Sequence, residues 1–188
     1  MRIKFYLICF LLLFARGCDF YSTGLWFFDH PEGETNPLVS VFHLGWNGLL
    51  ISNIILIGFI IYCFYYYTFK YSRTIPTNKP TRMSDYISEL YFNEKGKLYQ
   101  ILFKTPKNKK IAIAHFGYIV IRVAIIGSFL ATIHNICQYY NVSFYNNFRE
   151  IVGRPLYVIY VLILGSFIYY TYRLWLKEYS LAKNNTTN

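Results

Sequence analysis

The sequence predicts an all-α polytopic membrane protein with four transmembrane helices arranged as two helical hairpins, and three observations predict it. The chain of 188 residues is 55% hydrophobic and 21% aromatic, whereas a typical soluble domain has about 45–50% apolar residues. Its apolar residues gather in four runs, each long enough for a helix that crosses a bilayer, which takes about 20 residues. Most basic residues lie on one side of these runs, as they do in the cytoplasmic loops of membrane proteins.

The four runs belong to a single membrane domain that covers the whole chain. The expected spans are residues 4–28, 41–67, 111–139 and 155–175. The first has the basic start and apolar core of a signal peptide, but it continues past Asp19 and has no small-residue cleavage site, so we expect it to be retained. Pro37 and Pro155 fall at the starts of the second and fourth helices, where a proline lacks no hydrogen bond that the helix needs.

The distribution of charge predicts the orientation. The net charge is +10, and more than half of the 19 lysine and arginine residues lie in the loop 70–110, which we therefore place in the cytoplasm. The loop 29–40 carries Asp29, Glu32 and Glu34 and no basic residue. We expect it outside, together with the loop 140–153. Both termini are then cytoplasmic.

The basic loop 70–110 is expected to contact the membrane surface. Ser84 and Asp85 are expected to cap a short helix that runs through Phe92, and residues 93–96 have the composition of a turn. The apolar residues of the loop would lie on the bilayer, with the basic residues facing anionic lipid headgroups. Because the chain contains no nucleic-acid recognition motif, we expect the lipid bilayer as its partner, with a membrane protein or a second copy of the chain beside it, and no nucleic acid.

The four cysteines do not form a C-x-x-C pair. In the expected topology Cys9 and Cys63 lie toward the cytoplasm, and Cys18 and Cys137 toward the outside. We expect free thiols that pack as small apolar groups, and a Cys18–Cys137 disulfide is the alternative.

Polar residues inside the apolar runs are the candidate site. A charged side chain in hydrocarbon costs at least about 2.5–3.5 kcal/mol, so it needs a partner. Arg16 and Asp19 are three residues apart, and therefore share a helix face on which they can pair. His115, near the inner end of the third span, is expected to be an interfacial histidine unrelated to this site. The cluster that we expect in the outer half of the membrane comprises Arg16, Asp19, Ser22, Thr23, Glu34, Asn36, His43, Arg122, His134, Asn135 and Gln138.

Three interpretations of this cluster compete. It could join the helices through hydrogen bonds, each worth about 0.6–2 kcal/mol, or it could line an outward-facing cavity for a small ligand, ion or headgroup. Asp19, Glu34, His43 and His134 could instead hold zinc or another divalent metal that activates water. The sequence contains no H-E-x-x-H or G-x-S-x-G motif. We therefore expect a binding or assembly function in the membrane, and the alternative is a metal-dependent intramembrane hydrolase acting on a lipid or small molecule.

Residues 12–60 contain a pattern of polar residues. It consists of Asp19, then Ser22-Thr23, then Glu34-x-Asn36-Pro37-Leu38. This pattern resembles the DUF5658-like family of small bacterial membrane proteins of unknown function. Members of that family have an aspartate and a threonine in the first span, and often a lysine in the second span, where this chain has Asn47 and Asn53. The resemblance implies the membrane architecture and the choice of Asp19, Glu34 and Asn36 as site residues, but it implies no activity. We expect the protein in a bacterial inner membrane.

Overall fold

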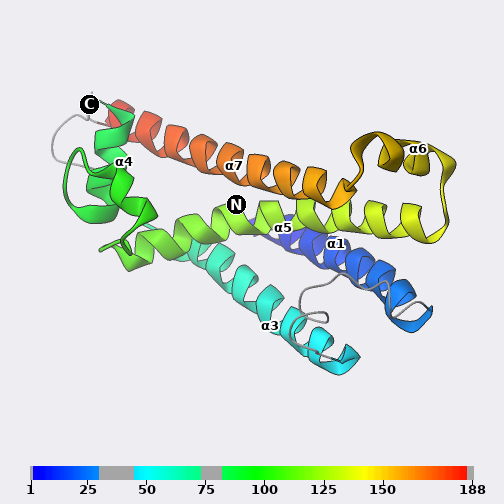
Figure 1. The fold of residues 1–188 in the computed structure, drawn as a ribbon. Coiled ribbons are helices and arrows are strands. Elements are labelled where there is room, and N and C mark those ends of the chain that lie inside the picture. Colours follow the sequence, from blue (N-terminus) through cyan, green and yellow to red (C-terminus); the bar gives the residue numbers. More distant parts are fainter. Residues whose placement is uncertain (1, 30–44, 73–81, 186–188) are drawn as a thin grey trace. The chain divides into compact units, whose positions relative to one another are not determined.

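The computed structural model describes residues 2–29, 45–72 and 82–185, and these residues are helical without any strand (Figure 1). Two short helical segments of the described chain are not α-helices. A π-helix, Tyr66–Lys70, continues α3, and a 3₁₀ helix covers Leu98–Leu102. The α-helices of the described chain are α1 (Arg2–Asp29), α3 (Trp46–Tyr65), α4 (Met83–Phe92), α5 (Lys109–Tyr139), α6 (Ser143–Val152) and α7 (Pro155–Asn185).

Three of these helices are long and apolar enough to cross a membrane. They are α3 with its π-helical end, α5 and α7. The all-helical fold is thereby confirmed, and by length and composition these three helices are compatible with a membrane protein. α1 is 28 residues long but is not one of the three, so the predicted fourth span stays a prediction.

Residues 140–153 were predicted to be a loop, and the structure corrects this because α6 lies there. Asn141, with a φ of 51°, and Gly153, with a φ of 73°, bracket the helix. Apolar residues recur in it with helical spacing, since Tyr145 and Phe148 are followed by Val152. That spacing in the sequence is the signal that indicates a helix between the two spans.

The fourth predicted span ended at Trp175, whereas α7 continues ten residues farther, to Asn185. Leu174, Glu178 and Ala182 are spaced four residues apart and are buried. They therefore form one buried stripe along the helix. This stripe explains why the helix continues into the basic end of the chain.

The basic loop contains a packed core, which the sequence did not predict. The apolar face of α4 is buried together with Ile111 of α5 and Ala182 of α7, so the prediction that these residues lie on the membrane surface is wrong. α4 ends at Phe92 as predicted, and Asn93 follows it with a φ of 59°. The predicted cap is wrong, because Arg82 occupies the cap position and no side chain caps the helix. The residues of α4 in this core are Tyr86, Ile87, Leu90, Tyr91 and Phe92.

The chain forms two compact units. Unit 1 comprises Met1–Ile61 and Ile121–Ser166, and unit 2 comprises Tyr62–Val120 and Phe167–Asn188. α1 and α6 belong to unit 1, and α4 belongs to unit 2. The three candidate spans α3, α5 and α7 each supply residues to both units.

In unit 1, α1 packs through one face. Phe5, Cys9, Leu12 and Ala15 are buried, and their spacing of three or four residues defines a single stripe. Nearer the C-terminal end of α1, the Trp46 ring lies among aromatic rings of that helix, 4.3 Å from Phe20, 5.3 Å from Phe27 and 4.9 Å from Phe28 between centroids.

In unit 2, α3 and α5 cross at Gly117 with their backbones in contact. A Cβ at this position would overlap the backbone of Cys63 and Phe64. Small residues at such crossings let membrane helices approach closely. All four cysteines are free thiols in the structure, and Cys9 and Cys63 are buried.

The crossing at Gly117 predicts opposite effects for two Gly→Ala substitutions. Gly117→Ala should lower the unfolding free energy by roughly 1–3 kcal/mol, because α3 must move away. Gly165→Ala is the matched control in α7, where no atom lies within 4 Å of an added Cβ; alanine there should be neutral or stabilise by up to about 1 kcal/mol. Thermal unfolding in detergent measures both, and equal Tm values for the two variants would contradict the close crossing.

Candidate functional site

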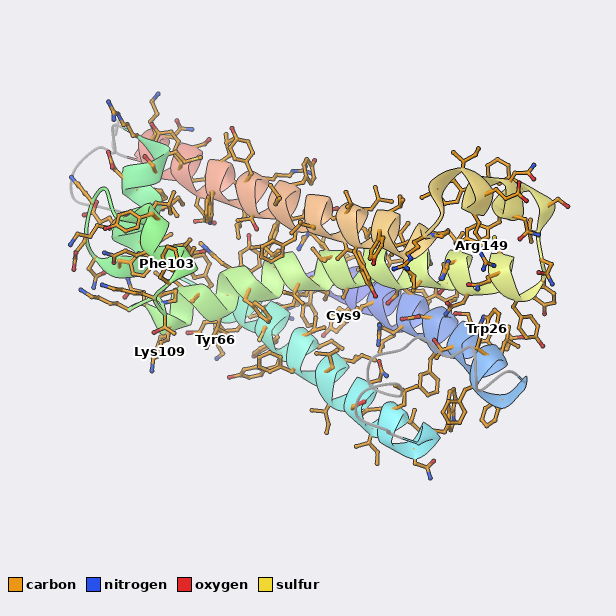
Figure 2. The ribbon with its side chains drawn as sticks, in the orientation of Figure 1. Cys9, Trp26, Tyr66, Phe103, Lys109 and Arg149 are labelled. Carbon is orange, nitrogen blue, oxygen red and sulfur yellow. The ribbon has the colours of Figure 1, made fainter. Side chains whose placement is uncertain are left out.

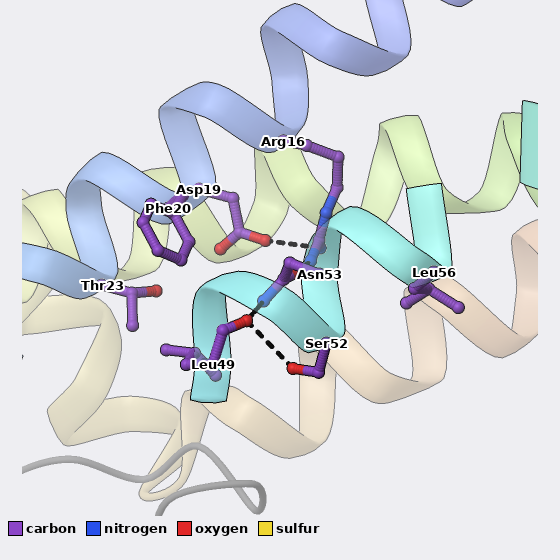
Figure 3. A pocket seen from close by; sticks show the side chains of 8 residues that line it. All are labelled: Arg16, Asp19, Phe20, Thr23, Leu49, Ser52, Asn53 and Leu56. Carbon is purple, nitrogen blue, oxygen red and sulfur yellow. Dashed lines mark hydrogen bonds and ion pairs between the residues drawn. The ribbon is translucent and has the colours of Figure 1, made fainter. Parts of the chain in front are cut away.

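Arg16 joins three helices of unit 1 (Figure 3). Its Nη1 lies 2.8 Å from Asp19 Oδ2 in α1, and donates to Ser128 Oγ in α5 at 3.2 Å. Its Nη2 donates to Asn53 Oδ1 in α3. The side chains of the Arg16–Asp19 pair are only 23% and 16% exposed. The predicted pairing of these two residues is therefore confirmed, and the pair is the centre of a larger hydrogen-bonded cluster.

Asn53 is oriented by its own helix. Its Nδ2 donates to the Leu49 carbonyl at 2.8 Å, and the Ser52 hydroxyl donates to the same carbonyl at 2.9 Å. With its amide nitrogen held in this way, Asn53 presents its oxygen to Arg16. An asparagine in the apolar middle of a helix thus accepts a charge-assisted hydrogen bond, which is stronger than a neutral one.

A second group of polar contacts continues along the same face of α1. Asn135 Nδ2, from α5, donates to Ser22 Oγ at 3.2 Å and to Thr23 Oγ1 at 3.4 Å. Trp26 Nε1 donates to the Asn135 carbonyl at 3.2 Å. The structure therefore brings together three of the predicted site residues, Ser22, Thr23 and Asn135, and adds Trp26.

His134 faces a different element from its neighbour Asn135. It is buried, and its Nδ1 is hydrogen-bonded to the hydroxyl of Tyr145 in α6. Burial raises the pKa of the Tyr145 hydroxyl above its ordinary value, so this hydroxyl stays protonated at neutral pH. His134 thus anchors α6 to α5, and it does not line the pocket beside Arg16.

A pocket of about 240 Å³ lies beside the Arg16 cluster. Most of its lining side chains are polar, and Figure 3 shows Arg16 extending from α1 toward Asn53 of α3 across it. Arg122 and Gln138, which were also predicted as site residues, are not among the lining residues. The pocket is lined by Arg16, Asp19, Phe20, Thr23, Leu49, Ser52, Asn53 and Leu56.

An apolar pocket of about 470 Å³ lies next to this polar pocket, and Phe20 lines both pockets. Gly17 and Gly24 of α1 form part of its wall, and nothing lies within 4 Å of a Cβ added at Gly17. The remaining lining residues are Tyr21, Leu25, Phe28 and Trp46. The two pockets together offer a polar end and an apolar end within one unit.

Three predicted site residues, Glu34, Asn36 and His43, lie outside the described residues. Of the four candidate metal ligands, the described ones are Asp19, which pairs with Arg16, and His134, which bonds Tyr145. Across residues 2–29, 45–72 and 82–185 there is no group of three or more histidine, cysteine, aspartate or glutamate residues arranged to hold a metal.

Sequence reasoning missed Asn53 and Ser128 as partners of Arg16. Each is a small polar residue within an apolar span, and that was the available signal. Tyr145 lies in α6, in a segment for which the sequence predicted no helix.

His115 is 1% exposed and belongs to unit 2, whereas the residues that surround Arg16 belong to unit 1, and the predicted position of His115 at the membrane interface stays a prediction. Within unit 2 its Nδ1 is 2.7 Å from the Tyr91 hydroxyl and its Nε2 is 3.3 Å from the Tyr71 hydroxyl. Tyr71 donates to the buried Glu178 at 3.3 Å, and Trp175 Nε1 donates to Tyr91 at 3.4 Å. Burial raises the pKa of Tyr91 to about 12, so its hydroxyl is protonated at neutral pH.

No family model, curated protein or solved structure matches the chain. The chemistry of the site must therefore be argued from its own residues. A guanidinium, a carboxylate, hydroxyls and an amide can bind a polar group by donating and accepting hydrogen bonds. The described residues that line the polar pocket include one guanidinium, one carboxylate, two hydroxyls and one amide, and no histidine or cysteine.

The Arg16–Asp19 pair predicts a non-additive mutational effect. Asp19→Leu leaves the Arg16 charge without its counter-ion and should destabilise the protein by roughly 1–3 kcal/mol, because a partly buried charge loses its main partner. The double variant Arg16→Leu/Asp19→Leu removes both charges and should cost less than Asp19→Leu alone. Unfolding in detergent measures each variant, and a double variant at least as damaged as Asp19→Leu would contradict the pairing as the source of the effect.

Proposed function

We propose that the protein is an integral protein of a bacterial inner membrane, with α1 as a fourth span and both termini in the cytoplasm, and that it binds an amphipathic molecule in unit 1. The polar head would occupy the pocket beside Arg16, and the tail would occupy the neighbouring apolar pocket. In this proposal the polar cluster serves binding in the membrane and not catalysis.

The observation that carries the proposal is the hydrogen-bonding capacity of Arg16. Its guanidinium has five N–H groups, and the bonds to Asp19, Ser128 and Asn53 use three of them. The side chain is 23% exposed and borders a pocket of about 240 Å³. In hydrocarbon an unsatisfied donor costs several kcal/mol, so the remaining N–H groups favour an acceptor within that pocket.

The apolar pocket is the reason why we propose an amphipathic ligand and not a purely polar one. It is about 470 Å³, and aromatic rings and two glycines form most of its wall. Glycines at a helix surface let another group approach the backbone closely. Because Phe20 lines both pockets, a single molecule with a short distance between its polar and apolar parts fits both.

Mass spectrometry of molecules that co-purify with the protein in mild detergent tests this proposal. Gly17→Leu fills the apolar pocket from a position with open space, and should reduce the co-purifying amphiphile at least about fivefold, equivalent to about 1 kcal/mol of lost apolar contact. Gly58→Leu makes the same change on α3, also in open space but outside both pockets, and should retain the molecule.

A third variant tests the polar half, since Thr23→Val removes a lining hydroxyl at nearly constant volume. It should weaken retention, and the Tm should change little because Asn135 keeps its shorter hydrogen bond to Ser22. The proposal fails if wild type carries no enriched amphiphile, or if Gly17→Leu and Gly58→Leu retain equal amounts.

A further inference from the structure

Unit 2 contains a strongly basic pocket that the function proposed above does not use. It has a volume of about 450 Å³, and four lysines line it (Figure 2, where Tyr66 and Lys109 are labelled). We propose that this pocket binds the phosphate of an anionic phospholipid headgroup. The lining residues are Tyr66, Lys70, Tyr71, Ser72, Lys107, Asn108, Lys109, Lys110 and Ile111.

The pocket lies at the ends of two candidate spans. Lys70 is the last residue of the span Trp46–Lys70, and Lys109 is the first residue of the span Lys109–Tyr139. Lipid headgroups lie at this level of a membrane, where lysine, arginine and tyrosine are enriched at helix ends. A phosphate attached to a lipid is therefore present at the pocket at high local concentration, which favours a lipid over a soluble anion.

The charge of the pocket is only partly compensated. No acidic residue lines it, and Glu94 bonds Lys107 Nζ at 2.7 Å and also pairs with Lys97. These two lysines lower the pKa of Glu94 to about 2, so Glu94 is charged at neutral pH and offsets part of the charge of Lys107. Within the described chain, the other lining lysines, Lys70, Lys109 and Lys110, form no ion pair.

The start of α5 adds backbone donors to the same pocket. The first i→i−4 bond there runs from the Ala112 N–H to the Asn108 carbonyl at 3.1 Å. The N–H groups of Lys110 and Ile111, which precede it, belong to residues that line the pocket. Such N–H groups and the positive end of the helix dipole attract phosphate.

The wall of the pocket is held in place by buried contacts. Tyr71 lines the pocket, and its hydroxyl bonds the buried side chains His115 and Glu178. On another side, Asn108 Nδ2 donates to the Leu90 carbonyl at 2.6 Å and to Asn93 Oδ1 at 2.9 Å. The lysines therefore extend from a packed framework, which distinguishes this pocket from a mobile basic loop that attracts anionic lipids nonspecifically.

Native mass spectrometry of the full-length protein in detergent, titrated with phosphatidic acid, phosphatidylglycerol or phosphatidylcholine, tests the proposal. Wild type should bind the two anionic lipids at least about tenfold more tightly than phosphatidylcholine, because each lysine near an anionic headgroup contributes about a factor of five. The variant Lys70→Gln/Lys109→Gln/Lys110→Gln should lose this preference. A control, Lys4→Gln/Lys95→Gln/Lys104→Gln, removes the same charge from exposed lysines outside the pocket and should keep the preference within about twofold of wild type.

Two results would overturn the proposal. Equal losses in the two triple variants would mean that net charge alone attracts the lipid. Inorganic phosphate that displaces phosphatidic acid at equal concentration would mean that the pocket binds a free anion and not a lipid headgroup. Neither result depends on the amphiphile in unit 1, because the lysine variants leave its pockets unchanged and Gly17→Leu leaves this pocket unchanged.

Discussion

Arg16 places the strongest single constraint on unit 1, because it puts a permanent charge halfway along a mostly apolar helix. In the proposed position of α1 as a span, lipid would offer no hydrogen-bond acceptor there, so the partners would have to come from protein. The structure supplies them from three helices, with Asp19 on α1, Asn53 on α3 and Ser128 on α5. Each interhelical hydrogen bond is worth only about 0.6–2 kcal/mol, but a misplaced helix would leave the charge without acceptors. The cluster therefore selects one arrangement of these helices more strongly than its bond energies suggest.

The same face of α1 changes its character along the helix. In the first half it carries the buried apolar stripe from Phe5 to Ala15, and in the second half it carries the polar residues from Arg16 to Trp26 that contact α3 and α5. The opposite face stays apolar and exposed, with Phe10, Leu13 and Tyr21 as examples. A helix of this kind suits a bilayer only when its polar half faces other helices. This is the physical argument for treating α1 as a span in the proposed function, although its sequence is interrupted by two charges.

In this site, contacts within one helix could be predicted from the sequence, whereas most contacts between helices could not. The Arg16–Asp19 pair follows from a spacing of three residues on one helix. The polar residues expected at matching depth included Ser22, Thr23 and Asn135, which the structure brings into contact. Asn53 and Ser128 could not be assigned, because their contact with Arg16 depends on the rotation and register of separate helices. His134 and Asn135 are adjacent in sequence, but 100° of helical rotation directs them to different elements. Only the packing of α6, which was predicted as a loop, determines what His134 contacts.

The basic segment shows how a charge pattern can conceal a core. Its lysines predict a surface that faces lipid headgroups. The apolar residues of α4, however, occur at helical spacing and pack with Ile111 and Ala182. That core also explains the length of α7, since Ala182 and the half-buried Tyr179 lie beyond the predicted end of the span. A lysine on a disordered loop loses conformational entropy whenever it binds a phosphate. Lysines that extend from the ordered ends of α3 and α5 lose less, because their backbones are already fixed, and several of them can therefore act on one anion at the same time.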